Sequence, residues 1–269
     1  MAKQARSKKK YFVVCDNKVL EREIEYDYFG GFANSQKQKC IKSLHSEIKK
    51  EYPNAQILEV STKSPNKILG IKLSAFNLKL NGSCVEDIFQ TSKVFLDKDG
   101  NRRSFYDIKN DIESDIFLLD KVKKTEQTQK LYQQIKGVFF LDTKLKRRLN
   151  KLYLLLYPDS VLDCFCFKNK LYPNMPVTFF YDYIYIKALL ENNIDISKYN
   201  IFTDIELSKN SINCQARSCA IYNYLYANNE LNAYISKIEN MQDFSEVNFK
   251  DIEEFYQYKI QKYHPEVLF

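Results

Sequence analysis

The segment with the clearest chemical potential covers residues 84–96, CVEDIFQTSKVFL. A helix turns 100° per residue, so Glu86, Gln90 and Lys93, spaced i, i+4 and i+7, would form one narrow polar row. The row borders the apolar side of that helix instead of opposing it, and such a row can line the rim of a pocket. There Glu86 would act as a general acid or base, and Lys93 as a cation for phosphate or as a desolvated nucleophile. The alternative is a surface helix on which Glu86 and Lys93 only pair, and the pattern alone favours it.

A second group of polar residues follows in FTDIE, residues 202–206, and SINCQARS, residues 211–218. Asp204 and Glu206 share a face if the first segment is extended, and Asn213 and Arg217 share one if the second is helical. Carboxylates, amides and a guanidinium so close together could bind a sugar diphosphate. The alternative is helix capping plus a salt bridge, which by itself explains the pattern better. The candidate ligand-binding residues here are Asp204, Asn213, Gln215 and Arg217.

A third group lies in the turn STKSPN, residues 61–66, and in KLSAFNL, residues 72–78. Hydroxyl and amide side chains in a turn that follows a strand often border a binding site. Lys63, Ser74 and Asn77 are therefore candidates for the wall opposite the second group. Most such turns are only turns, and that alternative stays open.

The elements that must position these residues are short and mixed. Strands are expected at 11–14, 23–28 and 55–60, and a helix over 35–51 with Ile41, Leu44 and Ile48 on one face. Ser83 would cap the helix 84–96, with Glu86 three residues later as in a capping box. The chain beyond is mostly helical, with helices over much of 104–157 and at 177–191, 211–226 and 249–261, a hairpin at 161–171 and a strand or extended loop at 202–207.

This order of elements predicts one domain of helices and a few short strands, with an extra C-terminal helix. Residues 1–10 are basic and are expected to form a disordered arm; the domain would cover 11–234, and a helical tail 235–269. No linker divides the chain.

Composition excludes several classes of function. The chain of 269 residues has 41 basic and 34 acidic residues, a formal charge of +7, which mildly favours phosphate-bearing partners. No glycine-rich phosphate loop is present, and seven cysteines without paired spacing, with only two histidines, make a zinc site improbable. No apolar run could span a bilayer. We expect a reduced, cytoplasmic protein that needs no metal or cofactor and contacts no membrane.

Taken in order, these segments resemble the NADAR family, and within it the NADAR antitoxins paired with DarT toxins. The resemblance covers about residues 20–230, except for 105–170, where the two cannot be aligned, and it does not reach the tail. Asp87 stands where the broader family's helix has a histidine, and the family's segment with tryptophan is missing; both departures suit the antitoxin branch. The segments that carry it are residues 31–32, 35–39, 43–45, 58–64, 69–78, 85–95, 180–189, 202–206 and 211–218.

The resemblance implies an α+β fold and an ADP-ribosyl hydrolase that removes ADP-ribose from guanine bases of DNA. The partners would be ADP-ribosylated DNA, the ADP-ribose product and a DarT-type toxin that places the modification. Breaking a bond between ribose C1 and nitrogen needs a carboxylate and a proton donor, for which Glu86 is the choice. Lys93 would either attack C1 as an amine or stay charged as an anchor. Gln90 and the residues of the second and third groups would hold the substrate.

A different class of function stays open. The chain could be an antitoxin without enzymatic activity that binds DNA or the toxin. The basic arm, the helix over 35–50 and the basic stretch 144–151 would then make the contacts to phosphate.

Overall fold

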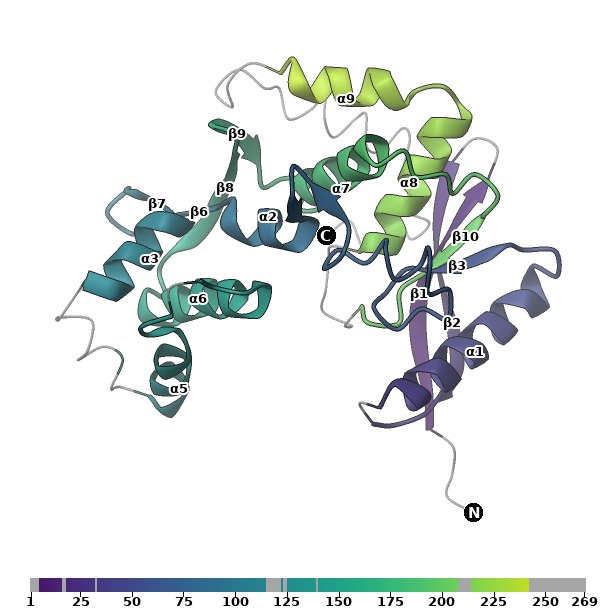
Figure 1. Cartoon of the computed structure of the whole chain (residues 1–269), viewed down its shortest axis with the longest axis horizontal. Helices are drawn as coiled ribbons and strands as arrows, with labels where there is room; N and C mark the ends of the chain where they lie inside the picture. Colours follow the sequence, from purple (N-terminus) through teal and green to yellow (C-terminus); the bar gives the residue numbers. More distant parts are fainter. Residues whose placement is uncertain are drawn as a thin grey trace.

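The computed structural model describes residues 5–15, 18–31, 33–114, 122, 125–138, 140–207 and 214–241 of the chain. Helices and strands are mixed in one α+β fold, which confirms the predicted class (Figure 1). The predicted helix at 249–261 lies outside the described residues. Within those residues, the structure has no helix with the length and apolar character needed to cross a membrane.

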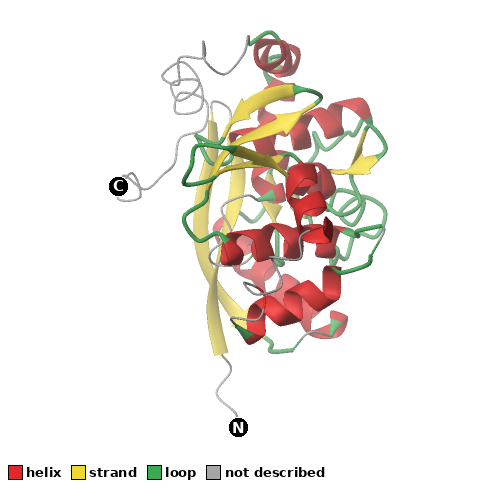
Figure 2. Cartoon of the chain, turned by 90° about the vertical axis from the view of Figure 1, so that its left-hand side faces the viewer, coloured by secondary structure: helices red, strands yellow, loops and turns green. Residues whose placement is uncertain are grey.

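The first sheet joins distant parts of the chain in the order β2-β1-β10-β3. Its strands β1 and β2 form a long antiparallel hairpin, β10 is antiparallel to β1, and β3 is parallel to β10. Figure 2 shows the long strands along one edge of the molecule, with helices beside them. The strands are β1 (Ala5–Cys15), β2 (Lys18–Tyr28), β3 (Ile57–Glu59) and β10 (Ile201–Thr203).

Alternation along β1 divides the core between two faces of this sheet. Tyr11 and Val13 pack with the buried residues of α1 (Asn34–Glu51), which are those of the predicted periodic face together with Cys40. Phe12 points to the other side and packs in a larger cluster with α7 (Phe179–Glu191) and α8 (Gln215–Ala227). The sheet therefore lies between α1 and the two helices that close the core.

The first ten residues are not a disordered arm where the structure describes them. Residues from Ala5 onward belong to β1, in register with β2. Three of the four bases between residues 5 and 10 have acids of β2 as neighbours across the strands, whereas Lys9 lies opposite Ile24. These ion pairs are Arg6–Glu25 at 3.9 Å, Lys8–Glu23 at 3.8 Å and Lys10–Glu21 at 2.7 Å. The sequence prediction treated the bases alone and missed their partners.

A second sheet, β7-β6-β8-β9, lies beside a separate helical cluster. In Figure 1 its strands lie above α6, with α3 beside them and α5 below α6. The helices of this part are α3 (Phe105–Ser114), α5 (Glu126–Ile135) and α6 (Thr143–Leu156). The strands are β6 (Lys93–Leu96), β7 (Arg102–Ser104), β8 (Val161–Phe167) and β9 (Lys170–Pro173), the last two forming the predicted hairpin. The small ladder β4 (Lys79–Leu80) with β5 (Ser83–Cys84) and the helix α9 (Leu231–Glu239) complete the fold.

The predicted helix over 84–96 is too long at its C-terminal end. The helix α2 covers Val85–Thr91, and the chain then enters β6, which is antiparallel to β8. Val94 and Phe95 are β-branched and aromatic residues that favour strands, and pairing with β8 outweighs the helical pattern. The cap is also different: the Cys84 thiol accepts the Asp87 N–H at 3.4 Å, while Ser83 lies in β5.

The segment from Ser61 to Leu78 is a compact chain of turns between β3 and β4 that contacts both α1 and α2. At one end, the Lys63 carbonyl accepts a hydrogen bond from Gln38 of α1. At the other, the Ala75 carbonyl accepts the Glu86 N–H of α2 at 3.0 Å. Between them Gly70 is fully packed against Glu59 and Ser64. We refer to residues 61–78 as the connecting segment.

Substitution of Gly70 should therefore loosen the connecting segment. A Cβ atom at this position would overlap the Glu59 carbonyl oxygen and lie 2.7 Å from the Ser64 Cβ. Overpacking of this kind costs about 1–3 kcal/mol, so Gly70→Ala should lower the free energy of unfolding by that amount in urea titrations. Gly30→Ala is the matched control, because the nearest atom to its added Cβ is Tyr28 Cε1 at 3.9 Å. Equal stability of the two variants would contradict this packing.

Candidate active site

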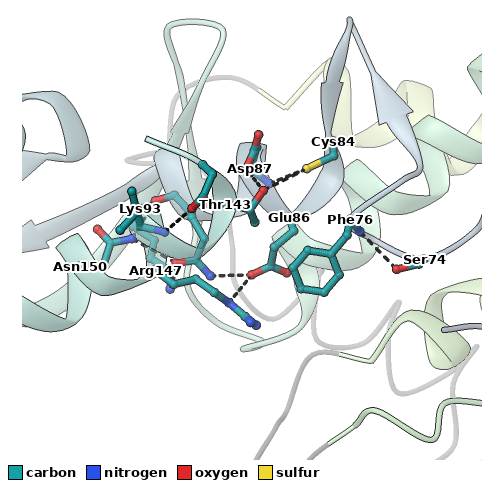
Figure 3. Close-up of polar contacts among 12 residues, drawn as sticks. Ser74, Phe76, Cys84, Glu86, Asp87, Lys93, Thr143, Arg147 and Asn150 are labelled. Carbon is teal, nitrogen blue, oxygen red and sulfur yellow. Dashed lines mark hydrogen bonds and ion pairs between the residues drawn. The ribbon is translucent and has the colours of Figure 1, made fainter. Parts of the chain in front are cut away.

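Glu86 is a buried carboxylate in the first turn of α2. Only 7% of its side chain is exposed, and its Oε1 atom lies 2.8 Å from Nε of Arg147, a residue of α6. The same oxygen accepts a hydrogen bond from Gln90 Nε2 at 2.9 Å. A buried carboxylate is costly unless it is paired, and these two partners supply the pairing. In Figure 3 Arg147 and Phe76 lie on either side of Glu86.

Gln90 connects Glu86 to Lys93. Its Nε2 donates to Glu86, and its Oε1 accepts from Lys93 Nζ at 3.0 Å. Asn150 of α6 donates to the same Oε1 at 3.1 Å and to the Gln90 carbonyl at 2.9 Å, which fixes the amide in one orientation. The three residues of the predicted polar row are thus brought together, although Lys93 is the first residue of β6 instead of part of the helix.

The Lys93 ammonium lies in a desolvated position. Its Nζ is 4.9 Å from the centre of the Phe89 ring, and burial lowers the pKa of Lys93 to about 8. The negative charge of Glu86 opposes this shift, and the positive charge of Arg147 adds to it. About half of these amines are neutral at pH 8, so the group is available as a nucleophile.

One face of α6 holds α2 in place. Lys146 Nζ lies 2.9 Å from Asp87 Oδ2, and Thr143 donates to the other carboxylate oxygen. Burial raises the pKa of Asp87, but the hydrogen bonds from Thr143 and Lys146 outweigh it, so the pKa is lowered. Thr143, Lys146, Arg147 and Asn150 are spaced i, i+3, i+4 and i+7, which places them on one side of the helix.

Asp204 and Gln215 form a second polar group next to Glu86. The Gln215 Oε1 accepts the Ala75 N–H at 2.7 Å, and the Ala75 carbonyl accepts the Glu86 N–H. The Gln215 side chain also bonds Asp204, whose Oδ1 accepts the backbone N–H of Glu206 at 2.9 Å. Burial, together with the negative charge of Glu59, raises the pKa of Asp204 to about 7. The connecting segment therefore links two of the predicted ligand-binding residues to Glu86.

Arg217 forms the kind of salt bridge that the sequence analysis kept open as the alternative to ligand binding. Its guanidinium forms a buried ion pair with Asp182 of α7 and donates to Thr178 at 2.8 Å. Ser218 donates to the other Asp182 oxygen at 2.7 Å. This pair joins α7 to α8, so the guanidinium is committed to the core. The predicted partner Asn213 lies outside the described residues.

The third predicted group has mostly structural contacts. Ser74 is fully buried, and its carbonyl accepts the Asn77 N–H at 2.8 Å. Asn77 is exposed, and its amide donates to the Ile71 carbonyl at 2.9 Å. Lys63 is half-buried, with its peptide anchored to Gln38 and Ser61. Ser74 and Asn77 thus shape the loop that carries Phe76.

Two residues of the site did not come out of the sequence analysis. Arg147 belongs to the basic stretch that was assigned to DNA phosphates, and nothing local in the sequence indicates that it pairs with Glu86. Phe76 is 40% exposed, and the Arg147 guanidinium carbon lies 5.5 Å from the centre of its ring. The available signal in the sequence was weak: an aromatic residue between Ala75 and Asn77 in a segment without a regular pattern. Together Arg147 and Phe76 border the buried carboxylate with a cation and a flat apolar surface.

No three His, Cys, Asp or Glu side chains gather as metal ligands in the part of the chain that the structure describes. The chemistry that the arrangement supports is acid–base catalysis by Glu86 and nucleophilic or electrostatic catalysis by Lys93. Arg147 and Lys93 lie near the Glu86 carboxylate, and their positive charges would also attract an anionic ligand.

The environment of Lys93 predicts opposite pKa shifts in two variants. Arg147→Ala removes a neighbouring positive charge, so the pKa of Lys93 should rise above 8. Glu86→Gln removes a negative charge, so the pKa should fall below 8. NMR titration of protein with ¹³Cε-labelled lysine measures both. Shifts in the same direction, or none, would show that Lys93 does not sense these charges.

Comparison with known proteins identifies a family for the chain. The model of the DarT1-associated NADAR antitoxin family matches residues 7–115 and 127–254. The match includes α2, β6 and α6, and therefore every residue of the Glu86 cluster. No curated protein matches the chain. With a family model matched over most of its length, the chain belongs to the NADAR antitoxins associated with DarT1.

Proposed function

We propose that the protein is an ADP-ribosyl hydrolase that removes ADP-ribose from guanine bases of DNA and so reverses the action of a DarT-type toxin. The observation that carries the proposal is the buried Glu86 carboxylate connected through Gln90 to the Lys93 amine. The family supports the antitoxin role. In this proposal the reaction takes place in the cytoplasm, where the DNA lies and where the seven free cysteines would stay reduced.

The reaction would break the bond between ribose C1 and the guanine amine, and a nucleophile would bond to C1 in its place. Glu86, paired with Arg147, starts as the base and accepts a proton from the nucleophile. The bond between C1 and the guanine amine breaks, and Glu86 returns the proton to the departing amine. If neutral Lys93 is the nucleophile, its Nζ bonds to C1 as the guanine amine leaves. The bond between C1 and the ring oxygen then opens, the ring oxygen takes the second amine proton, and C1 and Nζ form an imine. Water hydrolyses the imine, which frees the Lys93 amine, and the ribose ring closes again in the ADP-ribose product. If Lys93 stays charged, it holds a phosphate, and the nucleophile is water.

The surroundings of Glu86 suit both ends of this substrate. The Phe76 ring offers a stacking surface for the guanine base, which must lie next to the bond that breaks. Arg147 is half exposed and can shift toward the diphosphate, with Lys63 on the connecting segment. In this proposal Asp204 and Gln215 hold ribose hydroxyls. Because the Arg217 guanidinium is paired with Asp182 in the core, its role in this proposal is to position α8.

Removal of the Glu86 carboxylate should abolish most turnover without unfolding the protein. Positioned acid–base groups contribute about 10²–10⁴-fold, so Glu86→Gln should lower kcat on ADP-ribosylated guanine DNA by at least about 100-fold. Glu126→Gln is the control, because Glu126 is exposed on α5 and pairs with Lys130 on the same helix, a contact outside the Glu86 cluster. Release of ADP-ribose at catalytic protein concentrations also separates an enzyme from an antitoxin that only binds. Turnover near the wild-type value in Glu86→Gln would refute the assignment.

The two roles of Lys93 give different products under reduction. We expect the covalent role, since a desolvated amine beside a second cation is the environment that a nucleophilic lysine needs. Borohydride added during turnover should then trap an ADP-ribose adduct on Lys93, detectable by mass spectrometry of the peptides. Lys93→Arg, which keeps the charge, should be inactive. An active arginine variant without an adduct would identify Lys93 as an electrostatic anchor.

A further inference from the structure

A groove of about 700 Å³ runs along α1, and none of its lining residues belongs to the Glu86 cluster. One wall carries the ammonium groups of Lys39, Lys42 and Lys49, all three exposed. The apolar lining residues of the groove are Ile41, Ala55, Ile57 and Pro65. Amide and hydroxyl side chains complete the lining with Gln38, Ser46 and Gln56.

The charge of this groove is not neutralised within the described part of the chain. None of the three lysines has an ion-pair partner among those residues, whereas Lys50 of the same helix pairs with Glu47 at 2.8 Å. His45 adds no charge, because burial and the nearby Lys49 lower the pKa of its ring to about 4. The environments of other bases differ: Arg6, Lys8 and Lys10 of β1 lie near acids of β2, and Lys146 and Arg147 of α6 lie near acids of α2.

We propose that this groove binds the phosphate backbone of the DNA strand that carries the modified guanine. The inference rests on the proposed function for the identity of its ligand. Lys39 and Lys49 are ten residues apart, about 15 Å along the helix axis, a span that holds several phosphates of one strand. Neutral amides and an apolar floor beside a row of cations suit sugars and bases next to their phosphates.

The connecting segment gives a route from this groove to the candidate active site. Pro65 lines the groove, and the Lys63 carbonyl is bonded by Gln38 of the groove wall. The same segment continues to Phe76, beside Glu86. Figure 1 shows this stretch of chain between α1 and α2. A strand held along α1 would thus lead toward Phe76, and the groove would supply affinity while Glu86 and Lys93 supply the chemistry.

The experiment compares two triple variants that remove the same charge. Lys39→Gln, Lys42→Gln and Lys49→Gln together remove the groove cations. The control combines Lys98→Gln, Lys130→Gln and Lys136→Gln. All three are exposed: Lys98 lies in the β6–β7 turn, Lys130 on α5 and Lys136 directly after α5. Fluorescence anisotropy with an unmodified single-stranded oligonucleotide is measured from 50 to 300 mM salt.

The groove variant should lose about 10-fold or more in affinity at 50 mM salt. Its slope of log affinity against log salt should fall by about 2, since each phosphate contact on a single strand contributes roughly 0.7. The control triple should stay near wild type. Equal behaviour of the two triples would overturn the proposal. So would a groove variant that keeps its DNA affinity but loses binding to a purified DarT-type toxin, because the groove would then be a protein-binding surface.

A second readout separates this proposal from the proposed function. The groove variant should lose kcat/KM on a modified oligonucleotide but keep wild-type turnover of ADP-ribosylated guanosine, which is too short to reach α1. Equal losses on both substrates would mean that the lysines act on the active site, which overturns a backbone role. A wild-type protein that hydrolyses neither substrate refutes the proposed function instead, and the binding measurement still tests the groove.

Discussion

The ion pair between Glu86 and Arg147 is the contact on which the site depends. A carboxylate with so little solvent is stable only with a partner, and the partner comes from another helix, 61 residues later in the chain. The position of α6 therefore decides whether Glu86 can be a carboxylate inside the protein. The helix α6 is held in turn by Leu149 and Leu152, which lie fully buried in the second hydrophobic cluster. The packing of Leu149 and Leu152 on one side of α6 therefore positions Arg147, on the other side, next to Glu86.

The sequence correctly predicted features that depend on interactions between residues close together in the chain. The periodic face of α1 and the contact between Glu86 and Gln90 follow from helical spacing and appear in the structure. Lys93 reaches Gln90 as well, yet from a strand, because pairing of β6 with β8 ends the helix at Thr91. The contacts that were missed are long-range. Nothing near Arg217 in the sequence indicates that Asp182, from a different helix, will take its guanidinium. The same holds for Arg147 and Glu86.

Basic residues serve three separate purposes, which net charge alone does not distinguish. Most of those in β1 pair with acids across the hairpin, and Lys146 and Arg147 of α6 hold and neutralise the acidic first turn of α2. Lys39, Lys42 and Lys49 of α1 border a groove without such partners in the described chain. A formal charge of +7 therefore says little about where phosphate would bind. The sign of each base's nearest neighbours is the better guide.

Lys9 gives the start of the chain an unexpected importance. It is half-buried in β1, donates to the Ile205 carbonyl at 3.0 Å, and lies within electrostatic reach of Glu59 and Asp204. Those two carboxyl groups are buried and raise each other's cost of ionisation. Lys9 is thus an internal counter-ion that the chain supplies with its first strand. A protein shortened to begin at Tyr11 would keep the buried apolar residues of β1 and β2. It would still lose the Lys9 ammonium, whose positive charge favours the ionised forms of Glu59 and Asp204.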